Sequence, residues 1–337
     1  MNGLRFTRTG QVLCLLVLAV SWVGTAAAQS DDVERAYPLA PEGFDVRGEG
    51  IAQGNVERVE YDSSVVEGKR PAVIYTPPGY SSERSYPVLY LLHGIGGNEN
   101  HWTQFGAADA ILDNLIAAGK AEPMIVVMPH GRASNEPETA FGGGNRGRGA
   151  RAGGARDGGA PDGARAGGAP GGARAGGAPG GRGGRGGGGG GMGVEFEAYA
   201  AFERELVDDL IPFIEANYSV NADREYRALA GLSMGGGQSL NFGLANLEVF
   251  ASVGGFSSAP NTAQPAQLVT DPARAAEMLS VLWVSCGDED SLFNISEGVH
   301  NYLAENDVPH IWQIDVGAHT FPVWKNDLYH FASLIFK

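Results

Sequence analysis

The stretch that decides the fold runs from residue 226 to residue 236 and reads YRALAGLSMGG. Its apolar first half predicts a buried strand, and a helix-compatible run follows the Gly-x-Ser-x-Gly pattern centred on Ser233. On such a sharp turn the positions two before and two after the serine must lack side chains, and Gly231 and Gly235 meet that need. With 52 glycines in the chain the pattern alone is weak, and an ordinary serine in a glycine-rich turn is the alternative. The strand-to-helix context favours Ser233 as a nucleophile.

Short β-branched runs alternate with helical patterns from Glu57 onward, which indicates one α/β domain with a mostly parallel sheet covered on both faces. Eight strands are expected, near residues 57–63, 71–77, 86–92, 124–129, 226–231, 250–255, 281–286 and 310–315. Helices are expected near residues 106–118, 198–217, 235–246, 295–306 and 323–336. Pro212 should kink the second of these helices or end it early.

A serine hydroxyl becomes a good nucleophile when a base removes its proton, and that base is usually a histidine held by a carboxylate. In a fold with this turn, the order along the chain is serine, acid, histidine. Of the histidines after Ser233, only His319 lies in a loop just past the last predicted strand. We interpret His300, His310 and His330, which fall in or beside helices and strands, as structural. The sequence therefore predicts His319 as the base.

Three carboxylates follow the penultimate strand, in the segment CGDEDS at residues 286–291. One of them should orient His319. We favour Asp290 because it lies deeper in the loop than Asp288, which remains the alternative. A metal site is the other interpretation of this cluster, but no histidine or second group of carboxylates has matching spacing. We therefore expect no metal and no cofactor.

The oxyanion of an acyl-transfer intermediate needs two backbone N–H donors. The residue after the nucleophile, Met234, supplies one. The second is expected in LLHGIGG at residues 91–97, an apolar strand that ends in a glycine-rich turn, and Ile95 is the expected donor. This turn lacks the lysine and the glycine spacing of nucleotide-binding loops. His93 within it is interpreted as structural rather than as a second base.

Four segments together resemble carbohydrate esterase family 1, most nearly the feruloyl-esterase modules of bacterial xylanases. They are YLLHGIGGNENHW at 90–102, ALAGLSMGGGQS at 228–239, CGDEDS at 286–291 and GAHTFPVWK at 317–325. The resemblance spans the chain from about Gly43 to its end, apart from a glycine-rich tract. It implies the α/β-hydrolase fold and supports Asp290 over Asp288. The implied catalytic set is Ser233, Asp290 and His319, with oxyanion amides at Ile95 and Met234.

The chain departs from this family pattern at two places near the expected mouth of the site. His101 stands where the resemblance suggests an acidic residue, and the glycine-rich tract is additional. Trp102 and Trp324 are candidates for an aromatic wall that binds a phenolic acyl group, with buried packing as the alternative. The choice of substrate is therefore the least constrained part of the prediction.

The amino-terminal residues have a basic start, an apolar run over 12–23 and three alanines before Gln29. This pattern predicts a signal peptide cut after Ala28, which leaves a domain at 29–337. Since a membrane-spanning helix needs roughly 20 apolar residues, we expect a secreted or periplasmic protein that does not span the membrane. Once Cys14 is removed with the signal, Cys286 would be alone, so no intrachain disulfide is expected.

Residues 142–193 consist mainly of Gly, Ala, Arg and Pro, and the nonapeptide at 164–172 is repeated at 173–181. Such a segment cannot bury a core, so a disordered insertion is expected. We interpret it as a solvated spacer, with a basic tether to an acidic surface or polysaccharide as the alternative. Its eight arginines and two aspartates give a net charge of +6, so the rest of the chain carries -21 out of a total of -15. This acidity disfavours nucleic acid and anionic lipid as partners.

The combined prediction is a secreted serine carboxylesterase that acts on feruloyl esters of plant cell-wall xylan. Acetyl-xylan, siderophore and other small esters are alternative substrates for the same residues, and acyl transfer to a sugar is an alternative reaction. From another class, a non-catalytic carbohydrate-binding relative remains an alternative. The sequence leaves the oligomeric state open.

Overall fold

The computed structural model describes residues 35–135 and 190–337. The predicted signal peptide at 1–28 and nearly all of the tract at 142–193 lie outside the described residues, so both stay predictions. The tract's last four residues differ from expectation, because helix α3 begins at Gly190. The helical turns that follow Glu195 pack into the core. The same helix extends toward the amino terminus and includes the last glycines of the tract.

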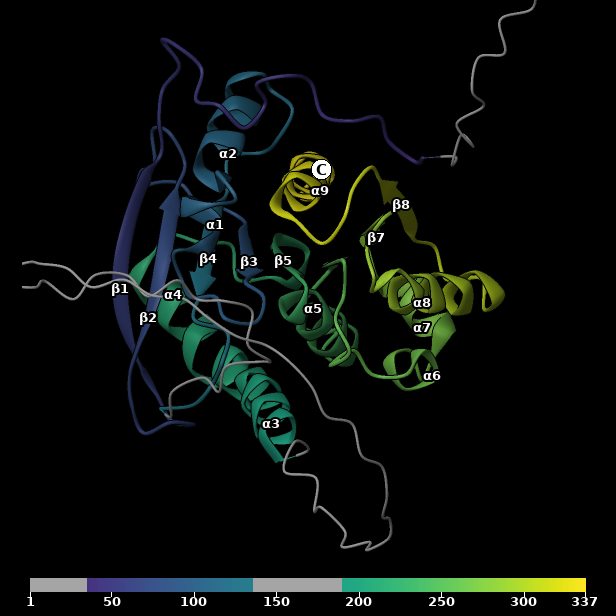
Figure 1. The fold of residues 1–337 in the computed structure, drawn as a ribbon. Helices are drawn as coiled ribbons and strands as arrows, with labels where there is room; N and C mark the ends of the chain where they lie inside the picture. Colours follow the sequence, from purple (N-terminus) through teal and green to yellow (C-terminus); the bar gives the residue numbers. More distant parts are fainter. Residues whose placement is uncertain (1–34, 136–189) are drawn as a thin grey trace, which may run out of the picture. The chain divides into compact units, whose positions relative to one another are not determined.

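An eight-stranded sheet forms the centre of the fold, in the order β1-β2-β4-β3-β5-β6-β7-β8 (Figure 1). The strands are β1 (Asn55–Ser63), β2 (Gly68–Thr76), β3 (Val88–Leu92), β4 (Ile125–Pro129), β5 (Arg227–Leu232), β6 (Ser252–Phe256), β7 (Val281–Gly287) and β8 (Ile311–Asp315). β2 pairs antiparallel with both β1 and β4, and every other pairing is parallel. The predicted α/β class with a mostly parallel eight-stranded sheet is confirmed.

The central strands are apolar on both faces because helices cover both sides of the sheet. In β3 every residue is buried, and its side chains alternate between two hydrophobic cores. Tyr90 and Leu92 belong to the core packed by α3, α4, α5 and α8. Leu89 and Leu91 belong to the core packed by α2 and α9.

The helices of the described residues include the five that periodicity predicts. Their bounds are α1 (His101–Gln104), α2 (Ala108–Ala117), α3 (Gly190–Arg204), α4 (Ile211–Asn217), α5 (Met234–Ala245), α6 (Pro265–Leu268), α7 (Pro272–Met278), α8 (Phe293–Glu305) and α9 (Phe321–Leu334). Sequence patterns missed α1, α6 and α7, because helices of four to seven residues are too short to show a repeating apolar face.

Of the two outcomes predicted for Pro212, a kink or an early end of the helix, the early end is wrong, because α4 continues to Asn217. A π-helical turn over Glu205–Leu210 comes directly before α4. Proline lacks an N–H, and its ring crowds the carbonyl four residues earlier. The wider turn accommodates that crowding, so the apolar face continues through Leu210 and Ile214.

None of the helices in the described residues is both long and apolar enough to cross a bilayer.

Candidate active site

Ser233 lies on the turn between β5 and α5, at the carboxyl edge of the parallel strands. Its φ of 55° and ψ of -119° lie in a region that costs a residue with a side chain about 1–3 kcal/mol. The turn also excludes side chains at its flanks. A Cβ on Gly231 would lie 2.5 Å from the Gly235 carbonyl oxygen, and one on Gly235 would lie 2.5 Å from the His93 carbonyl oxygen. The two glycines are therefore required, as the motif predicts.

The structure brings together the three residues predicted as a triad. His319 Nε2 lies 2.8 Å from Ser233 Oγ, and His319 Nδ1 lies 2.7 Å from Asp290 Oδ2. The three side chains come from the loops after β5, β7 and β8. With its Nδ1 proton donated to Asp290, the imidazole presents Nε2 as an acceptor for the Ser233 hydroxyl. This arrangement can activate a serine.

The two candidate acids have different surroundings. The side chain of Asp290 is fully buried, and its second oxygen accepts the Leu292 N–H at 2.9 Å. Asp288 is exposed, and it accepts the Gly317 N–H at 2.8 Å. Asp290 therefore holds the imidazole, while Asp288 holds the loop that carries His319.

The two predicted oxyanion donors lie beside Ser233. Met234 is the first residue of α5, and Ile95 follows Gly94, whose backbone touches the nucleophile: a Cβ there would lie 2.9 Å from Ser233 Cβ. Within residues 35–135 and 190–337, neither the Ile95 nor the Met234 N–H donates to another group of the protein. Both donors are thus available to an oxyanion formed at Ser233.

Neither predicted tryptophan forms a wall of the site. Trp102 is 1% exposed, and its indole N–H donates to the Leu92 carbonyl at 2.9 Å, so it is a core residue. Trp324 is 6% exposed and packs edge-on against His319, with ring centroids 4.8 Å apart. Its indole therefore contacts the imidazole from within the hydrophobic core. The expectation of a substrate wall from these residues is replaced by buried packing.

An aromatic surface that the sequence analysis missed lies between the oxyanion loop and the His319 loop. We call His101, Phe105 and Phe321 the aromatic surface. Phe105 is 53% exposed, and its ring centroid lies 5.3 Å from that of His101 and 5.7 Å from that of Phe321. The sequence signal was the Phe that follows two residues after His319 in GAHTF.

A small apolar cluster touches both oxyanion residues. It comprises Ile95, Phe196, Tyr199, Met234, Ala259 and Leu292. Because Phe196 and Leu292 are only partly buried, this cluster offers apolar surface next to the reacting atoms.

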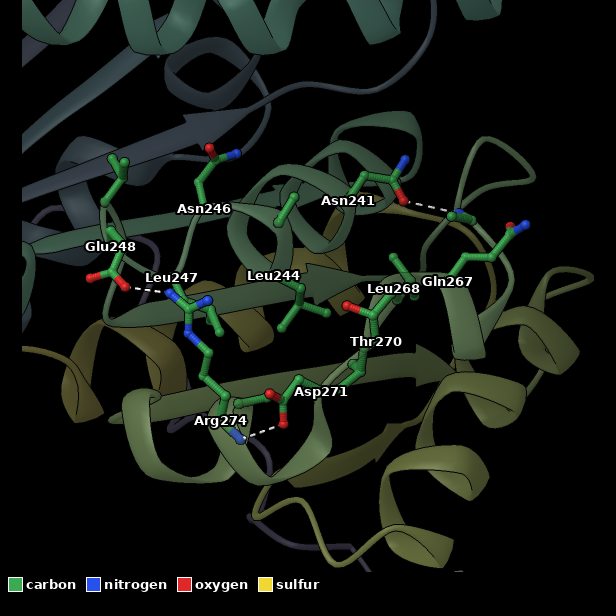
Figure 2. A pocket seen from close by; sticks show the side chains of 15 residues that line it. Asn241, Leu244, Asn246, Leu247, Glu248, Gln267, Leu268, Thr270, Asp271 and Arg274 are labelled. Atoms are coloured by element: carbon green, nitrogen blue, oxygen red, sulfur yellow. Dashed lines mark hydrogen bonds and ion pairs between the residues drawn. The ribbon is translucent and has the colours of Figure 1, made fainter.

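A separate hollow of about 450 Å³ lies near the opposite end of α5 (Figure 2). Asn241 and Leu244 line it, and an ion pair between Arg274 and Glu248 lies at its side. None of the triad residues borders it. The candidate active site is therefore assigned by chemical geometry, not by the depth of a cavity.

A family model described as a putative esterase matches residues 63–157 and 192–329. The two matched ranges are separated by part of the glycine tract. The match thus includes the loops that carry Ser233, Asp290, His319 and both oxyanion amides.

By sequence, the chain is 29% identical over 305 residues to an endo-1,4-beta-xylanase/feruloyl esterase of Xylanibacter ruminicola. The alignment covers 89% of this chain and 34% of that protein, so the chain spans about a third of this relative's length.

Among solved structures, a CE1 ferulic acid esterase from Anaeromyces mucronatus in complex with ferulic acid is similar, with a TM-score of 0.67 and 23% identity. The match covers 88% of this chain and 96% of that one. A feruloyl esterase module from Clostridium thermocellum, complexed with sinapinate, gives a TM-score of 0.61 at 19% identity, over 90% and 95% of the two chains. These likenesses show the α/β-hydrolase fold.

Proposed function

We propose that this chain, which belongs to the putative esterase family, is a carboxylic ester hydrolase with Ser233 as its nucleophile, and that it releases phenolic acids from plant cell-wall esters. The observation that carries the mechanism is the continuous chain of hydrogen bonds from Ser233 through His319 to Asp290. The Ile95 and Met234 amides lie beside it and have no other acceptor among the described residues.

In the first half of the reaction, Ser233 Oγ attacks the ester carbonyl and His319 Nε2 takes the hydroxyl proton. The carbonyl oxygen becomes an oxyanion that accepts hydrogen bonds from the Ile95 and Met234 amides. When the C–O bond to the alcohol breaks, His319 gives its proton to the leaving oxygen. Asp290 stabilises the imidazolium throughout, and the acyl group stays on Ser233.

In the second half, His319 takes a proton from water, which attacks the acyl carbon of the Ser233 ester. The tetrahedral intermediate uses the same two amides. Its collapse breaks the bond to Ser233 Oγ, which regains a proton from His319 and frees the acid. This cycle requires no cofactor.

The test is Ser233→Ala, assayed with p-nitrophenyl acetate. Loss of the nucleophile should lower kcat by about 10⁴-fold or more, and labelling by a fluorophosphonate probe should disappear. An unchanged circular dichroism spectrum would show that the variant is folded. Undiminished hydrolysis by this variant would refute the mechanism.

Two observations support a phenolic acyl group as the substrate. The relatives that the chain resembles include feruloyl esterases, and the aromatic surface presents the exposed ring of Phe105 beside Phe321, which follows two residues after His319. Purified protein should therefore hydrolyse methyl ferulate with a higher kcat/KM than it shows for acetylated xylan. The opposite order would favour an acetyl-xylan esterase. Ester products formed with added sugars would instead indicate acyl transfer.

We further propose that the protein acts after export, as a secreted or periplasmic enzyme, on the basis of the pattern at residues 1–28. Amino-terminal sequencing of the exported protein should begin at Gln29. A mature chain that retains residues 1–28 would contradict this proposal.

A further inference from the structure

The carbonyl of Gly94 accepts several hydrogen bonds on the side of the peptide away from Ile95 N. His93 Nδ1 donates to it at 2.6 Å, the Gly97 N–H at 3.1 Å and the Tyr199 hydroxyl at 3.4 Å. A peptide is planar and trans, so its carbonyl and N–H point in opposite directions. Holding Gly94 O in place therefore fixes the direction of the Ile95 N–H.

These donors belong to a closed ring of hydrogen bonds. His93 Nε2 accepts the Gly131 N–H at 3.0 Å. The Gln238 amide donates to the carbonyls of Gly131 and Tyr199, both at 2.7 Å. Tyr199 then returns to Gly94 through its hydroxyl. We call His93, Gln238 and Tyr199 the oxyanion ring.

Each side chain of the oxyanion ring is 1% exposed, so water does not compete for its hydrogen bonds. The ring connects four parts of the fold: the loop after β3, the loop after β4, α3, and α5, which begins at the nucleophile turn. Hydrogen bonds accepted by a carbonyl also polarise its peptide, which strengthens the N–H on the other side as a donor.

His93 is neutral in the folded protein, as its hydrogen bonds to Gly94 and Gly131 require. Burial, together with the neighbouring His130, lowers the pKa of His93 to about 3. The ring nitrogen that bonds Gly94 O therefore carries the single proton of a neutral imidazole, and the other accepts from Gly131. The bonding pattern persists over the pH range in which an esterase is assayed.

We propose that His93, Gln238 and Tyr199 are positioning residues that aim and polarise the Ile95 N–H of the oxyanion hole. This inference rests on the proposed function, in which that N–H binds the oxyanion. None of the three side chains needs to touch the substrate. Their effect should therefore appear in transition-state stabilisation and not in substrate binding.

A matched pair of substitutions separates positioning from packing. In His93→Asn the amide lies near the position of Nδ1 and can still donate to Gly94 O, whereas in His93→Gln the amide reaches the position of Nε2. Removing an oxyanion donor lowers kcat by about 10²- to 10³-fold, so misaiming one should lower it less. We expect kcat with p-nitrophenyl acetate to fall about 10-fold or more in His93→Gln and to be largely rescued in His93→Asn, with KM unchanged in both.

Gln238→Met and Tyr199→Phe test the rest of the ring. A trifluoromethyl ketone adds to Ser233 and forms an oxyanion there. Across the wild type and these variants, kcat/KM and the affinity for this inhibitor should decrease in parallel. Tyr75→Phe is the control, because it removes a buried tyrosine hydrogen bond, to Asp113, in the opposite core. It should lower the melting temperature and leave both kinetic values unchanged.

Two outcomes separate the inference from the proposed function. If the wild-type protein is active but the ring variants only melt earlier, with kcat and ketone affinity intact, the inference is overturned and the proposed function stands. If folded wild-type protein turns over no ester, both are overturned. If Gln238→Met does not fold, Tyr199→Phe and the two His93 variants still decide the result.

Discussion

At the scale of single residues, the depth of each carboxylate decides its role. Asp290 is fully buried and accepts from His319 Nδ1 and from the Leu292 N–H. Its charge acts on the imidazole with little screening by water. Asp288 is exposed, and its bond to the Gly317 N–H orders a loop. We therefore propose that these two aspartates, two positions apart, differ in function, because only Asp290 is sheltered and aimed at the proposed base.

The substitutions Asp290→Asn and Asp288→Asn form a matched pair that tests this difference. An amide at position 290 removes the charge that stabilises the imidazolium, so kcat with p-nitrophenyl acetate should fall by about 10³- to 10⁴-fold. The exposed Asp288→Asn should change kcat by less than about fivefold. Steady-state kinetics measure both, with circular dichroism as the folding control. Equal losses in the two variants would contradict the assignment.

The residues that we propose for bond-making chemistry were predictable, because that chemistry restricts the sequence around them. Ser233 needs glycines on a sharp turn, and His319 must follow the last strand in a loop. Trp102 and Trp324 obey no such restriction. Whether a tryptophan faces a cleft or a core depends on distant partners, such as the Leu92 carbonyl for Trp102. Sequence patterns therefore identified the three residues that the structure brings together as the proposed triad, and they misplaced the aromatic wall.

Substitution of Phe105 tests the aromatic surface. Because an aromatic pair contributes about 0.5–1.5 kcal/mol, Phe105→Ala should raise KM for methyl ferulate by about 3- to 10-fold. KM for p-nitrophenyl acetate, whose acetyl group has no aromatic ring to pack against Phe105, should stay unchanged. Tyr226→Ala is the control, since Tyr226 is an exposed aromatic that precedes β5, at the opposite end of the strand from Ser233. A similar KM increase for both esters would exclude a role in acyl recognition.

At the scale of elements, a buried ion pair joins the two ends of the segment that contains the glycine tract. Arg132 follows β4 and Glu195 lies in α3, with Nε to Oε2 at 2.6 Å and Nη2 to Oε1 at 3.2 Å. Both side chains are buried. The Ala133 N–H also donates to the Ala198 carbonyl at 3.0 Å. The fold therefore fixes these ends to each other regardless of the number of residues between them.

Breaking this pair from one side should be costly. Glu195→Met leaves the Arg132 guanidinium buried without this carboxylate, so the free energy of unfolding should fall by about 3–5 kcal/mol. The double substitution Arg132→Met with Glu195→Met should recover most of the loss. Arg274→Ala, which breaks an exposed pair with Glu248, is the control and should cost about 1 kcal/mol or less. Urea unfolding measures all of them, and a loss below that of the control would contradict the role of the pair.

The elements themselves were largely predictable. A strand that is buried on both faces has apolar residues at successive positions, so each central strand is a short apolar run in the sequence. β3 and β4 appear in the sequence as YLL and VVM runs for this reason. The π-helical turn before Pro212 was not predictable, because periodicity constrains which face is apolar and not how many residues fill one turn. This turn accommodates the local effect of the proline, and the apolar face continues past it.

At the scale of the whole molecule, buried titratable groups set how stability depends on pH. Burial is the main cause that lowers the pKa of His93 to about 3 and that of His130 to about 4. Burial also raises the pKa values of Asp315 and Asp327. The folded protein thus favours neutral histidine and neutral aspartate. The histidines make the free energy of unfolding rise with pH, whereas the aspartates make it fall with pH.

On the acid side, the unfolded chain binds protons at His93 and His130 near pH 6.5, whereas the folded protein does not. The free energy of unfolding should therefore decrease as the pH falls below about 6.5, by up to about 1.4 kcal/mol per pH unit for each group. Urea unfolding at about pH 7 and pH 5 measures this slope. His93→Asn should reduce this slope by the contribution of one proton, up to about 1.4 kcal/mol per pH unit. An unchanged slope would show that His93 is protonated in the folded protein.

On the alkaline side, Asp327 is the deciding group. It is fully buried in α9 and accepts the Trp283 indole N–H at 3.1 Å, and its pKa is raised by burial and by the charge of Asp315. A folded-state pKa above the unfolded value means that stability is complete below about pH 4 and is lost as the pH rises through the raised pKa.

Asp327→Asn should remove this loss, because an amide keeps the oxygen that accepts from Trp283 and adds a donor where a protonated carboxyl would have one. Between about pH 7 and pH 9, above the range in which the two histidines contribute, the free energy of unfolding should then fall less steeply with rising pH than in the wild type, by up to about 1.4 kcal/mol per pH unit. Asp62→Asn, an exposed carboxylate paired with Lys69, is the control and should leave the slope unchanged. If the Asp327 and Asp62 variants give the same slope, Asp327 is ionised in the folded protein and its burial must be stabilised in another way.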